Sequence, residues 1–420
     1  MPPVAVAYLS SHFLSFLGNG ILAVALPLIV LKTTGSPLSV GAVSTATAVP
    51  ALLVGLAAGV LIDRVNRRSC SILSDVVSAG AVAAIPVVDL LWGLNMTWLV
   101  ALAIVGSFGD VPGMTARQVM VPAVARHAGV SLERLIRLRQ SMTSMALVIG
   151  PAAAGTLLSL FDSSTVLFVT AATSAAAALI TATMPHRLGR VDTDAAHRDS
   201  LWTQLAAGAS ALRGSKFLTG TVTLTVGLAV ALGGLQGMVL PLHFSVIARP
   251  DLLGFVLTAL AIGMLFGSTT FAAVGTRRSR RFWMTVALIG TSVGFLLMAT
   301  LVSPAWIFAG AAVLGLANSA LGAVLGVLQA ERIPDGIRGR VLSLQNAALQ
   351  VAAPAGIGLA AVVAEYGSPI AAGLAVFAVW LAIVLSLALS RALTDLEPSA
   401  DRNLARSVGE QIHEPAEHAR

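Results

Sequence analysis

The sequence predicts an all-α polytopic membrane protein whose twelve transmembrane helices form two pseudo-symmetric halves of six helices each. Three observations predict this fold: an apolar composition, recurrent apolar runs of membrane-spanning length, and an internal repeat. Of the 420 residues, 56% are hydrophobic and 11% are charged, and the mean hydropathy is +0.88. Because a soluble domain carries charge on about 25% of its residues, this composition indicates that lipid surrounds much of the chain.

Each predicted helix is a run of mostly apolar residues. A helix rises about 1.5 Å per residue, so about 20 residues cross a hydrocarbon core about 30 Å thick. Runs of this size lie near residues 4–31, 38–62, 69–92, 96–119, 138–160, 163–184, 217–242, 252–275, 282–302, 304–328, 341–363 and 368–392. The first run has no basic residues before it and is longer than the core of a signal peptide, so we expect an uncleaved membrane helix.

The basic residues indicate the orientation of these helices. If the N-terminus is cytoplasmic, the connections that follow even-numbered helices and the C-terminal tail hold 24 of the 26 Lys and Arg residues. Lys32 and Arg249 are the two exceptions. Because basic residues concentrate in cytoplasmic loops, this bias predicts a multi-pass protein of the inner (plasma) membrane with both termini in the cytoplasm.

An internal repeat divides the chain into two halves. Leu26-Pro27-Leu28 recurs as Leu240-Pro241-Leu242, and Pro37 with Gly41 recurs as Pro250 with Gly254, at offsets of 213 or 214 residues. Such a repeat is typical of two bundles in parallel orientation. We expect an N-terminal bundle at residues 1–184, a polar cytoplasmic linker at 185–216, a C-terminal bundle at 217–393 and a disordered cytoplasmic tail at 394–420.

Composition and motifs argue against other classes of protein. The single cysteine, Cys70, excludes an internal disulfide, and no Cys/His cluster has the spacing of a metal site. The net charge of +7 lies in short clusters between apolar runs, which is the pattern of membrane loops and not of nucleic-acid binding. No phosphate-binding loop with its lysine is present, and no nucleophile, metal or paired-carboxylate constellation stands out. We therefore expect no enzyme, no cofactor and no nucleic-acid partner.

The loop after the second predicted helix carries the most specific motif. It comprises Gly59-Val-Leu-Ile-Asp63-Arg64-Val-Asn-Arg67-Arg68 and resembles the signature loop of the major facilitator superfamily. The resemblance implies the major facilitator fold and a conformational-switch role for this loop, in which Asp63, Arg64 and Arg67 latch the two halves. The alternative is that the arginines only anchor the topology on the cytoplasmic side.

Two further stretches resemble one branch of that superfamily, the twelve-helix macrolide-type and siderophore-type exporters. They are Ala116-Arg117-Gln118 with Val121-Pro122 at the end of helix four, and Arg332-Ile333-Pro334-Asp335 with Arg338-Gly339-Arg340 before helix eleven. With the first loop, these similarities span nearly the whole chain up to about residue 392. The resemblance implies a secondary transporter, and we expect it to work as a monomer.

Helix five carries Gly150-Pro151 followed by three alanines and Gly155, which resembles the glycine-proline motif of antiporters. A proline inside a helix removes a backbone hydrogen bond and bends the helix, and small residues let a neighbour pack closely. Ala154 departs from the antiporter pattern, which has glycine at that position. The motif therefore matches the antiporter pattern in part.

Ionisable residues inside the membrane are few. Because each costs about 2.5 to 3.5 kcal/mol to insert, each needs a partner, a water-filled cavity or a function. Asp110 lies deepest in helix four and is the first candidate for proton coupling, although Gly109, Pro112 and Gly113 beside it also permit a purely structural role. Asp75, the second candidate, and Arg117 lie near the cytoplasmic ends of neighbouring helices, so an ion pair with a structural role is expected between them.

Polar residues on the first helix of each half, and on later helices, are candidates for a central substrate cavity. They are His12, Asn19, Gln236, His243, Asn318, Gln345 and Asn346. Polar side chains inside bundles also bond between helices, which is the alternative for each of them. A cavity otherwise lined by apolar side chains favours a bulky, amphipathic substrate.

Together these observations predict a secondary active transporter that exports a drug-like or siderophore-like compound by proton antiport with alternating access. Its expected partners are a small-molecule substrate, protons and the lipid bilayer. One alternative is proton-independent uptake or facilitated passage. A second alternative, from another class, is a membrane receptor or assembly factor that keeps the transporter scaffold without moving a solute.

Overall fold

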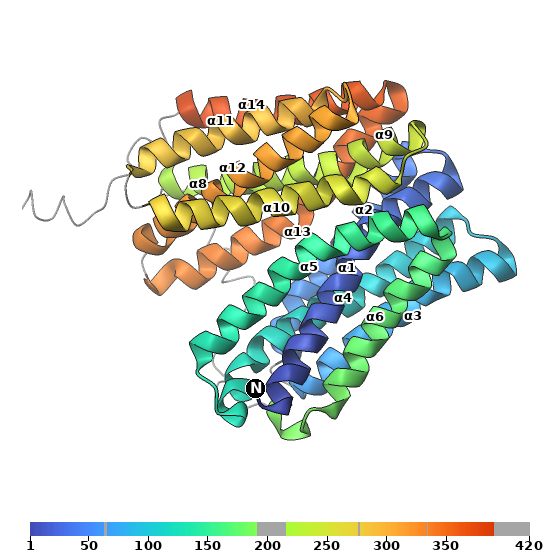
Figure 1. Ribbon diagram of the computed structural model, residues 1–420, viewed down its shortest axis with the longest axis vertical. Helices are drawn as coiled ribbons and strands as arrows, with labels where there is room; N and C mark the ends of the chain where they lie inside the picture. The colour runs from blue at the N-terminus through green and yellow to red at the C-terminus, as the bar shows by residue number, and fades with distance from the viewer. Residues whose placement is uncertain (63–64, 191–215, 276–277, 334, 390–420) are drawn as a thin grey trace, which may run out of the picture.

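The computed structural model describes residues 1–62, 65–190, 216–275, 278–333 and 335–389, and helices are the regular elements of these ranges. Six long helices make up the N-terminal half in Figure 1. They are α1 (Pro3–Thr34), α2 (Pro37–Ile62), α3 (Arg67–Trp92), α4 (Met96–Ala128), α5 (Leu132–Leu160) and α6 (Ser163–Thr183), followed by a 3-10 turn, η1 (His186–Gly189).

The C-terminal half repeats this arrangement with one interruption. Its elements are α8 (Lys216–Gly234), η2 (Leu235–Val239), α9 (Leu240–Val246), α10 (Asp251–Val274), α11 (Arg280–Ala299), α12 (Pro304–Arg332), α13 (Asp335–Tyr366) and α14 (Pro369–Leu389). The segment η2 is a π-helix, so α8, η2 and α9 together form one spanning unit where the sequence predicts a regular helix over 217–242. Twelve helices in the described ranges are long and apolar enough to cross a membrane, which confirms the predicted fold class.

Helices α4 and α5 are longer than their apolar runs. The sequence predicts that they end at 119 and begin at 138, whereas the structure continues them to Ala128 and back to Leu132. Local capping explains this extension: Gly129 ends α4 in the left-handed conformation with φ 62°, and the side chain of Ser131 accepts a hydrogen bond from the Arg134 amide at the start of α5. Polar residues break an apolar run without ending a well-capped helix.

The two halves meet at one end of the molecule and diverge at the other. Across the boundary, α2 packs against α13 and α5 packs against α10, while α1 contacts η2 and α9. In Figure 1 the halves converge on the right and separate on the left, and the N-terminus lies at the separated end. We call these the contact end and the open end.

Polar and backbone contacts hold the contact end together. The Glu365 carboxylate on α13 accepts hydrogen bonds from the Ser36 hydroxyl (2.8 Å) and the Leu38 amide (3.1 Å) at the start of α2. At the other crossing, an added Cβ on Gly155 would lie 2.7 Å from the Asp251 carbonyl oxygen, so α5 and α10 approach at backbone distance.

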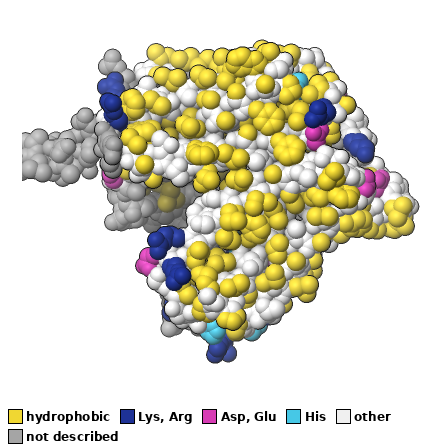
Figure 2. All heavy atoms as spheres, in the orientation of Figure 1, with side chains coloured by type: hydrophobic (Ala, Val, Ile, Leu, Met, Phe, Trp, Pro, Cys, Tyr) yellow, Lys and Arg dark blue, Asp and Glu magenta, His cyan; other side chains and the backbone are white. Residues whose placement is uncertain are grey.

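The outer surface suits a lipid environment. On the face shown in Figure 2, hydrophobic side chains spread over both halves, with Lys and Arg side chains near the ends of the helices. Exposed apolar side chains such as those of Leu90, Leu179 and Leu265 would be unfavourable in contact with water and are favourable in contact with lipid. The predicted linker from residue 191 to 215, within the boundaries 185–216, and the tail at 394–420 lie outside the described residues, so these domain boundaries stay predictions.

Candidate functional site

A cavity of about 710 Å³ lies between the two halves. Helices α1, α2 and α4 line it from the N-terminal half, and α8, η2, α10 and α13 from the C-terminal half. Among the described residues that line it, the polar ones are Asn19, Ser44, Thr47, Asp110 and Gln236, and the others are glycine or apolar. This volume lies in the range of about 300 to 1,000 Å³ that holds drug-sized ligands.

Three residues singled out from the sequence meet at this cavity: Asn19, Asp110 and Gln236. Asn19 comes from α1, Asp110 from the middle of α4 and Gln236 from η2. Because their helices belong to different halves, any ligand that contacts all three bridges the halves. Ser44 and Thr47 on α2 also line the cavity, and they were not predicted because hydroxyl residues are common inside membrane helices.

The π-helix determines how the C-terminal half contributes to the cavity. Both Gln236 and Gly237 lie within η2 and line the cavity. A π-turn accommodates one extra residue in a helix, and such insertions are frequent at functional sites. The extra residue agrees with the repeat offsets, because Gly20 corresponds to Gly233 at 213 residues whereas Pro27 corresponds to Pro241 at 214. The offset returns to 213 at Pro37 and Pro250, so the extra residue is confined to this segment and could have indicated the π-helix from the sequence.

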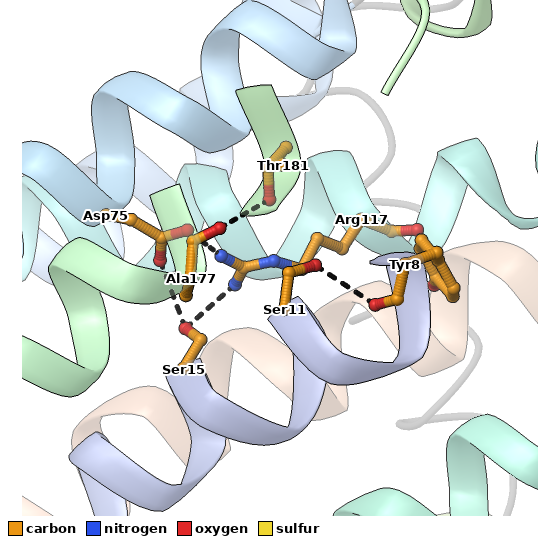
Figure 3. A network of polar contacts seen from close by, with 7 residues as sticks. All are labelled: Tyr8, Ser11, Ser15, Asp75, Arg117, Ala177 and Thr181. Carbon is orange, nitrogen blue, oxygen red and sulfur yellow. Dashed lines mark hydrogen bonds and ion pairs between the residues drawn. The ribbon is translucent and has the colours of Figure 1, made fainter. Parts of the chain in front are cut away.

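A buried ion pair connects α3 and α4 (Figure 3), and its arginine lies two turns of α4 beyond the cavity residue Asp110. Arg117 and Asp75 are paired through Nη2 and Oδ2, and both side chains are almost fully buried. From α1, the Ser15 hydroxyl donates to Asp75 Oδ1 (3.1 Å) and accepts from Arg117 Nη1 (2.9 Å). The ion pair predicted from the sequence is present. Ser15 was not predicted as its third member.

Tyr8 extends this network along α1. Its hydroxyl donates to the backbone carbonyl of Arg117 (3.0 Å), and the Ser11 hydroxyl donates to the Tyr8 carbonyl (3.0 Å). All of these groups are buried, so each hydrogen bond is needed to satisfy a polar atom that water does not reach. The network joins α1, α3 and α4 into one unit next to the cavity.

His12 differs in position from the prediction that it lines the cavity. It is buried on the side of α1 that faces α5, where its Nε2 lies 2.9 Å from the Thr143 hydroxyl. Its ring stacks on that of Tyr8 and packs at a tilt against that of Phe16. His12 is not among the residues that line the cavity. The sequence places it on the correct helix, but it does not specify which face of α1 turns toward α5.

Four other cavity candidates also lie away from the lining of this cavity. His243 is half-buried on α9 with its ring against Phe244, and Asn318 is half-buried on α12. Gln345 accepts a hydrogen bond from Gln329 (3.0 Å), which links α13 to α12. Asn346 is exposed on α13. These four are therefore weaker substrate candidates than Asn19 and Gln236.

The loop between α2 and α3 is described in part. Asp63 and Arg64 lie outside the described residues, and Gly59 lies in the last turn of α2. Arg68 donates from Nε to the Thr181 carbonyl (3.3 Å) and from Nη2 to the Ala182 carbonyl (2.5 Å), so it binds the last carbonyls of α6. Arg67 is half-buried, and in the described ranges its Nε has no hydrogen-bond partner. The described contacts of Arg68 stay within the N-terminal half.

The glycine-proline motif of α5 packs against α1 and α10. An added Cβ on Gly150 would lie 3.0 Å from the Gly20 Cα of α1, and Gly155 faces α10 at the contact end. The C-terminal half has a corresponding crossing, at which Gly233 of α8 lies against the backbone of Ala353, the residue before Pro354. Through these two glycines, α5 packs closely against α1 of its own half and against α10 of the other half.

Comparison with known proteins identifies the family. The sequence model of the Major Facilitator Superfamily matches residues 8–248 and 223–413. The multidrug efflux pump Tap of Mycolicibacterium fortuitum is 31% identical over 381 residues, which cover 89% of this chain and 90% of that protein. Macrolide efflux protein A of Streptococcus pyogenes is 23% identical, with 84% and 87% covered.

Solved structures agree with this fold. The crystal structure of the nucleoside transporter NupG aligns with a TM-score of 0.76 over 92% of this chain and 98% of that chain, at 16% identity. The chain belongs to the major facilitator superfamily, and it is a multi-pass membrane transporter of small molecules. The predicted resemblance to this superfamily and its exporter branch is confirmed.

Proposed function

We propose that this chain exports small amphipathic compounds, drug-like or siderophore-like, in exchange for protons. The observation that carries this proposal is the cavity between the halves, which combines apolar walls with a carboxyl group, that of Asp110. Apolar walls bury the body of an amphipathic molecule, and a carboxyl group inside the membrane exchanges protons. Relatives that are multidrug and macrolide efflux proteins support export as the direction.

The way the halves meet supports alternating access as the mechanism. The cavity lies between two bundles that contact each other at one end and separate at the end that carries the N-terminus. With both termini in the cytoplasm, as the basic residues predict, this conformation admits substrate from the cytoplasmic side. Rocking the halves apart at the contact end would release the substrate outside. Because one chain holds both halves and the whole cavity, a monomer suffices.

Asp110 is the preferred proton-coupling residue and Asp75 the second candidate. Asp75 is buried in an ion pair with Arg117, so protonating it requires breaking that pair. Asp110 faces the cavity instead, and within the described part of the chain it forms no ion pair. Protonating Asp110 therefore breaks no ion pair, so it costs less free energy than protonating Asp75.

Flux in proteoliposomes tests the proposal. With an imposed pH gradient, wild-type protein should move a fluorescent amphipathic compound against its concentration gradient, while Asp110→Asn should fall to the rate of protein-free liposomes yet still bind a neutral substrate. Normal gradient-driven transport by Asp110→Asn would remove this residue from the mechanism.

Two other outcomes distinguish the alternatives. Wild-type flux that is identical with and without the gradient would indicate facilitated passage without protons. Binding without flux of any compound would indicate a receptor or assembly role on the same scaffold. A susceptibility screen of cells lacking or overexpressing the protein, across antibiotics, dyes and iron chelators, would identify the substrates to use.

A further inference from the structure

A group of polar side chains between α1, α4 and α5 takes no part in the proposed export mechanism. On α1 it comprises Tyr8 and His12, whose rings stack at a centroid distance of 6.4 Å. Arg117 of α4 and Arg139 of α5 both act electrostatically on these two rings. We call these four residues the arginine cluster. Three of them are almost fully buried, and Arg139 is half-buried, so a ligand would enter the cluster beside Arg139.

The described residues leave three atoms of the arginine cluster without a hydrogen-bond partner. They are His12 Nδ1, Arg117 Nε and Arg139 Nε, which make up half of the six such buried side-chain atoms in the described ranges. A buried polar atom without a partner costs about 1 to 3 kcal/mol. Because buried polar atoms are normally paired, their concentration at one place indicates that a ligand or ordered water binds there.

The missing partner must both accept and donate hydrogen bonds. The Nε groups of Arg117 and Arg139 are donors. The Thr143 hydroxyl donates to the Arg139 carbonyl (3.2 Å), so we assign it as the acceptor of the hydrogen bond from His12 Nε2 (2.9 Å). Nδ1 of the same neutral ring is then an acceptor. A guest that satisfies all three atoms therefore needs acceptor oxygens and one hydroxyl group.

The arginine cluster also lacks a negative charge. Arg117 is paired with Asp75, but Arg139 forms no ion pair within the described part of the chain. With His12 neutral, two guanidinium groups and one carboxylate leave a net charge of +1. Because a partly buried charge in a membrane protein is costly without a counter-charge, an anion stabilises this place more than water does.

The position of the two arginines determines which anions can reach them. Arg117 and Arg139 lie at the ends of the apolar runs 96–119 and 138–160, close to the predicted cytoplasmic surface of the membrane. Lipid head groups lie at this level, and free anions of the cytoplasm reach it from the water. Guanidinium groups bind phosphate oxygens through paired, charge-assisted hydrogen bonds. A phosphate group that keeps a hydroxyl matches the charge, the hydrogen-bonding pattern and the depth.

We propose that the arginine cluster binds a phosphate group that carries a hydroxyl, at a site separate from the cavity between the halves. The phosphate oxygens accept from Arg117 and Arg139, and the hydroxyl donates to His12. No member of the cluster is among the described residues that line the cavity, so this site does not depend on the proposed export function. The group belongs either to a free phosphate or to the head group of a phosphomonoester lipid.

Thermal unfolding of the purified, delipidated full-length protein in detergent tests the site and its source. At about pH 6, where phosphate keeps a hydroxyl and sulfate does not, the protein would be titrated with each anion at equal ionic strength. The lipid arm compares short-chain phosphatidic acid with phosphatidylcholine of equal chain length. The rise in the unfolding midpoint of wild type over that of Arg139→Gln measures binding at the site, because general salt effects act on both.

We expect phosphate or phosphatidic acid to produce this rise at a concentration at least about tenfold lower than sulfate or phosphatidylcholine does. A rise with phosphate alone would identify a free phosphate as the ligand, and a rise with phosphatidic acid at lower concentration would identify a lipid head group. No difference between wild type and Arg139→Gln with any of the four compounds would mean that the cluster holds water alone, and would overturn the proposal.

Further variants separate the site from surface charge and from folding defects. Without added anion, Arg139→Gln should be at least as stable as wild type, because it removes a charge that has no partner. Arg134→Gln is the matched control, since Arg134 is an exposed arginine of the same helix, and it should keep the whole rise. His12→Phe should still bind the anions but lose the preference for phosphate over sulfate. An equal loss in Arg134→Gln and Arg139→Gln, or a preference retained in His12→Phe, would contradict the assigned contacts.

Discussion

The two halves share one architecture and differ in what lies at their helix crossings. In the N-terminal half, α3 and α4 are joined by a buried ion pair, Asp75 with Arg117, to which Ser15 of α1 adds hydrogen bonds.

In the C-terminal half, the corresponding crossing of α11 with α12 has an ion pair, Arg280 with Glu331, at the start of α11 and the end of α12. Its apolar part relies on glycine, because an added Cβ on Gly294 of α11 would lie 2.7 Å from the Leu314 amide nitrogen. Glycine also lies where α12 crosses α10. Gly315 of α12 lies so close to α10 that an added Cβ would overlap the Leu260 carbonyl. The sequence from residue 282 to 330, which includes most of α11 and most of α12, contains no charged residue.

The two halves therefore provide side chains of different kinds. The buried ion pair of Asp75 with Arg117 and the cavity carboxyl group of Asp110 lie in α3 and α4, whereas the C-terminal half lines the cavity with apolar residues, glycines and the uncharged side chain of Gln236. The repeat makes the difference testable. Asn66 and Ser279 cap α3 and α11 at an offset of 213, so Asp75 corresponds to Leu288, and Arg117 corresponds to Gln329 at an offset of 212.

Removing one partner of the buried pair should produce the largest effect on stability. Arg117→Met leaves the Asp75 carboxylate buried without a counter-charge, which costs about 3 to 5 kcal/mol. We expect a large fall in the midpoint of thermal unfolding in detergent, followed by the fluorescence of a thiol-reactive dye at buried Cys70.

The C-terminal half supplies the control for this variant. Asp75→Leu with Arg117→Gln installs the residues of the corresponding crossing and removes both charges together, so most of the lost stability should return. This double variant should also retain gradient-driven transport if Asp110 alone carries the proton. A double variant no more stable than Arg117→Met would contradict a structural role for the pair.

A methyl group at the glycine crossing should have a smaller effect. Gly315→Ala forces α12 away from α10 and should destabilise the C-terminal half by about 1 to 3 kcal/mol, the usual cost of overpacking. Gly322→Ala on the same helix meets nothing within 4 Å and should be neutral or stabilising by up to about 1 kcal/mol, because alanine favours helix over glycine. Equal unfolding midpoints for the two variants would show that close packing at Gly315 does not limit stability.

The sequence predicted those parts of this comparison that depend on periodicity and charge. Twelve apolar runs and the Asp75–Arg117 pair follow from rules that act on each residue or helix separately, and both are present. The sequence did not predict the direction in which individual side chains point, because that direction depends on how neighbouring helices are rotated relative to one another. His12 and Asn19 are both polar residues of α1, but packing turns His12 toward Thr143 of α5 and Asn19 into the cavity.

Backbone irregularity was the other limit on prediction. The π-helix that carries Gln236 depends on one extra residue in the C-terminal repeat, which shifts the offset from 213 to 214 without any unusual residue type. Gly322 shows the reverse case. Two glycines four residues apart, such as Gly322 and Gly326, are typical of a close helix crossing, yet an added Cβ at either one would meet nothing within 4 Å.

The smallest of the expected effects concerns the boundary between the halves. Glu365 is an acid of the C-terminal half that caps α2 of the N-terminal half, so opening the contact end must break its hydrogen bonds to Ser36 and Leu38. Glu365→Gln weakens this cap by removing its charge, and Glu365→Ala removes it altogether. Both variants should shift the population toward a form open at the contact end, with alanine having the larger effect.

Thiol accessibility measures that shift. In a Cys70→Ala background, a cysteine introduced at Val43, which is buried and lines the cavity, should react several-fold faster with an impermeant reagent added outside when Glu365 is replaced. Asp162→Asn is the matched control, since Asp162 also caps a helix through Ser164 and Thr165 but stays within its own half. If both replacements accelerated labelling equally, the effect would come from fraying of helix ends. Acceleration confined to Glu365 would assign the inter-half contact a direct part in keeping the cavity closed to the outside.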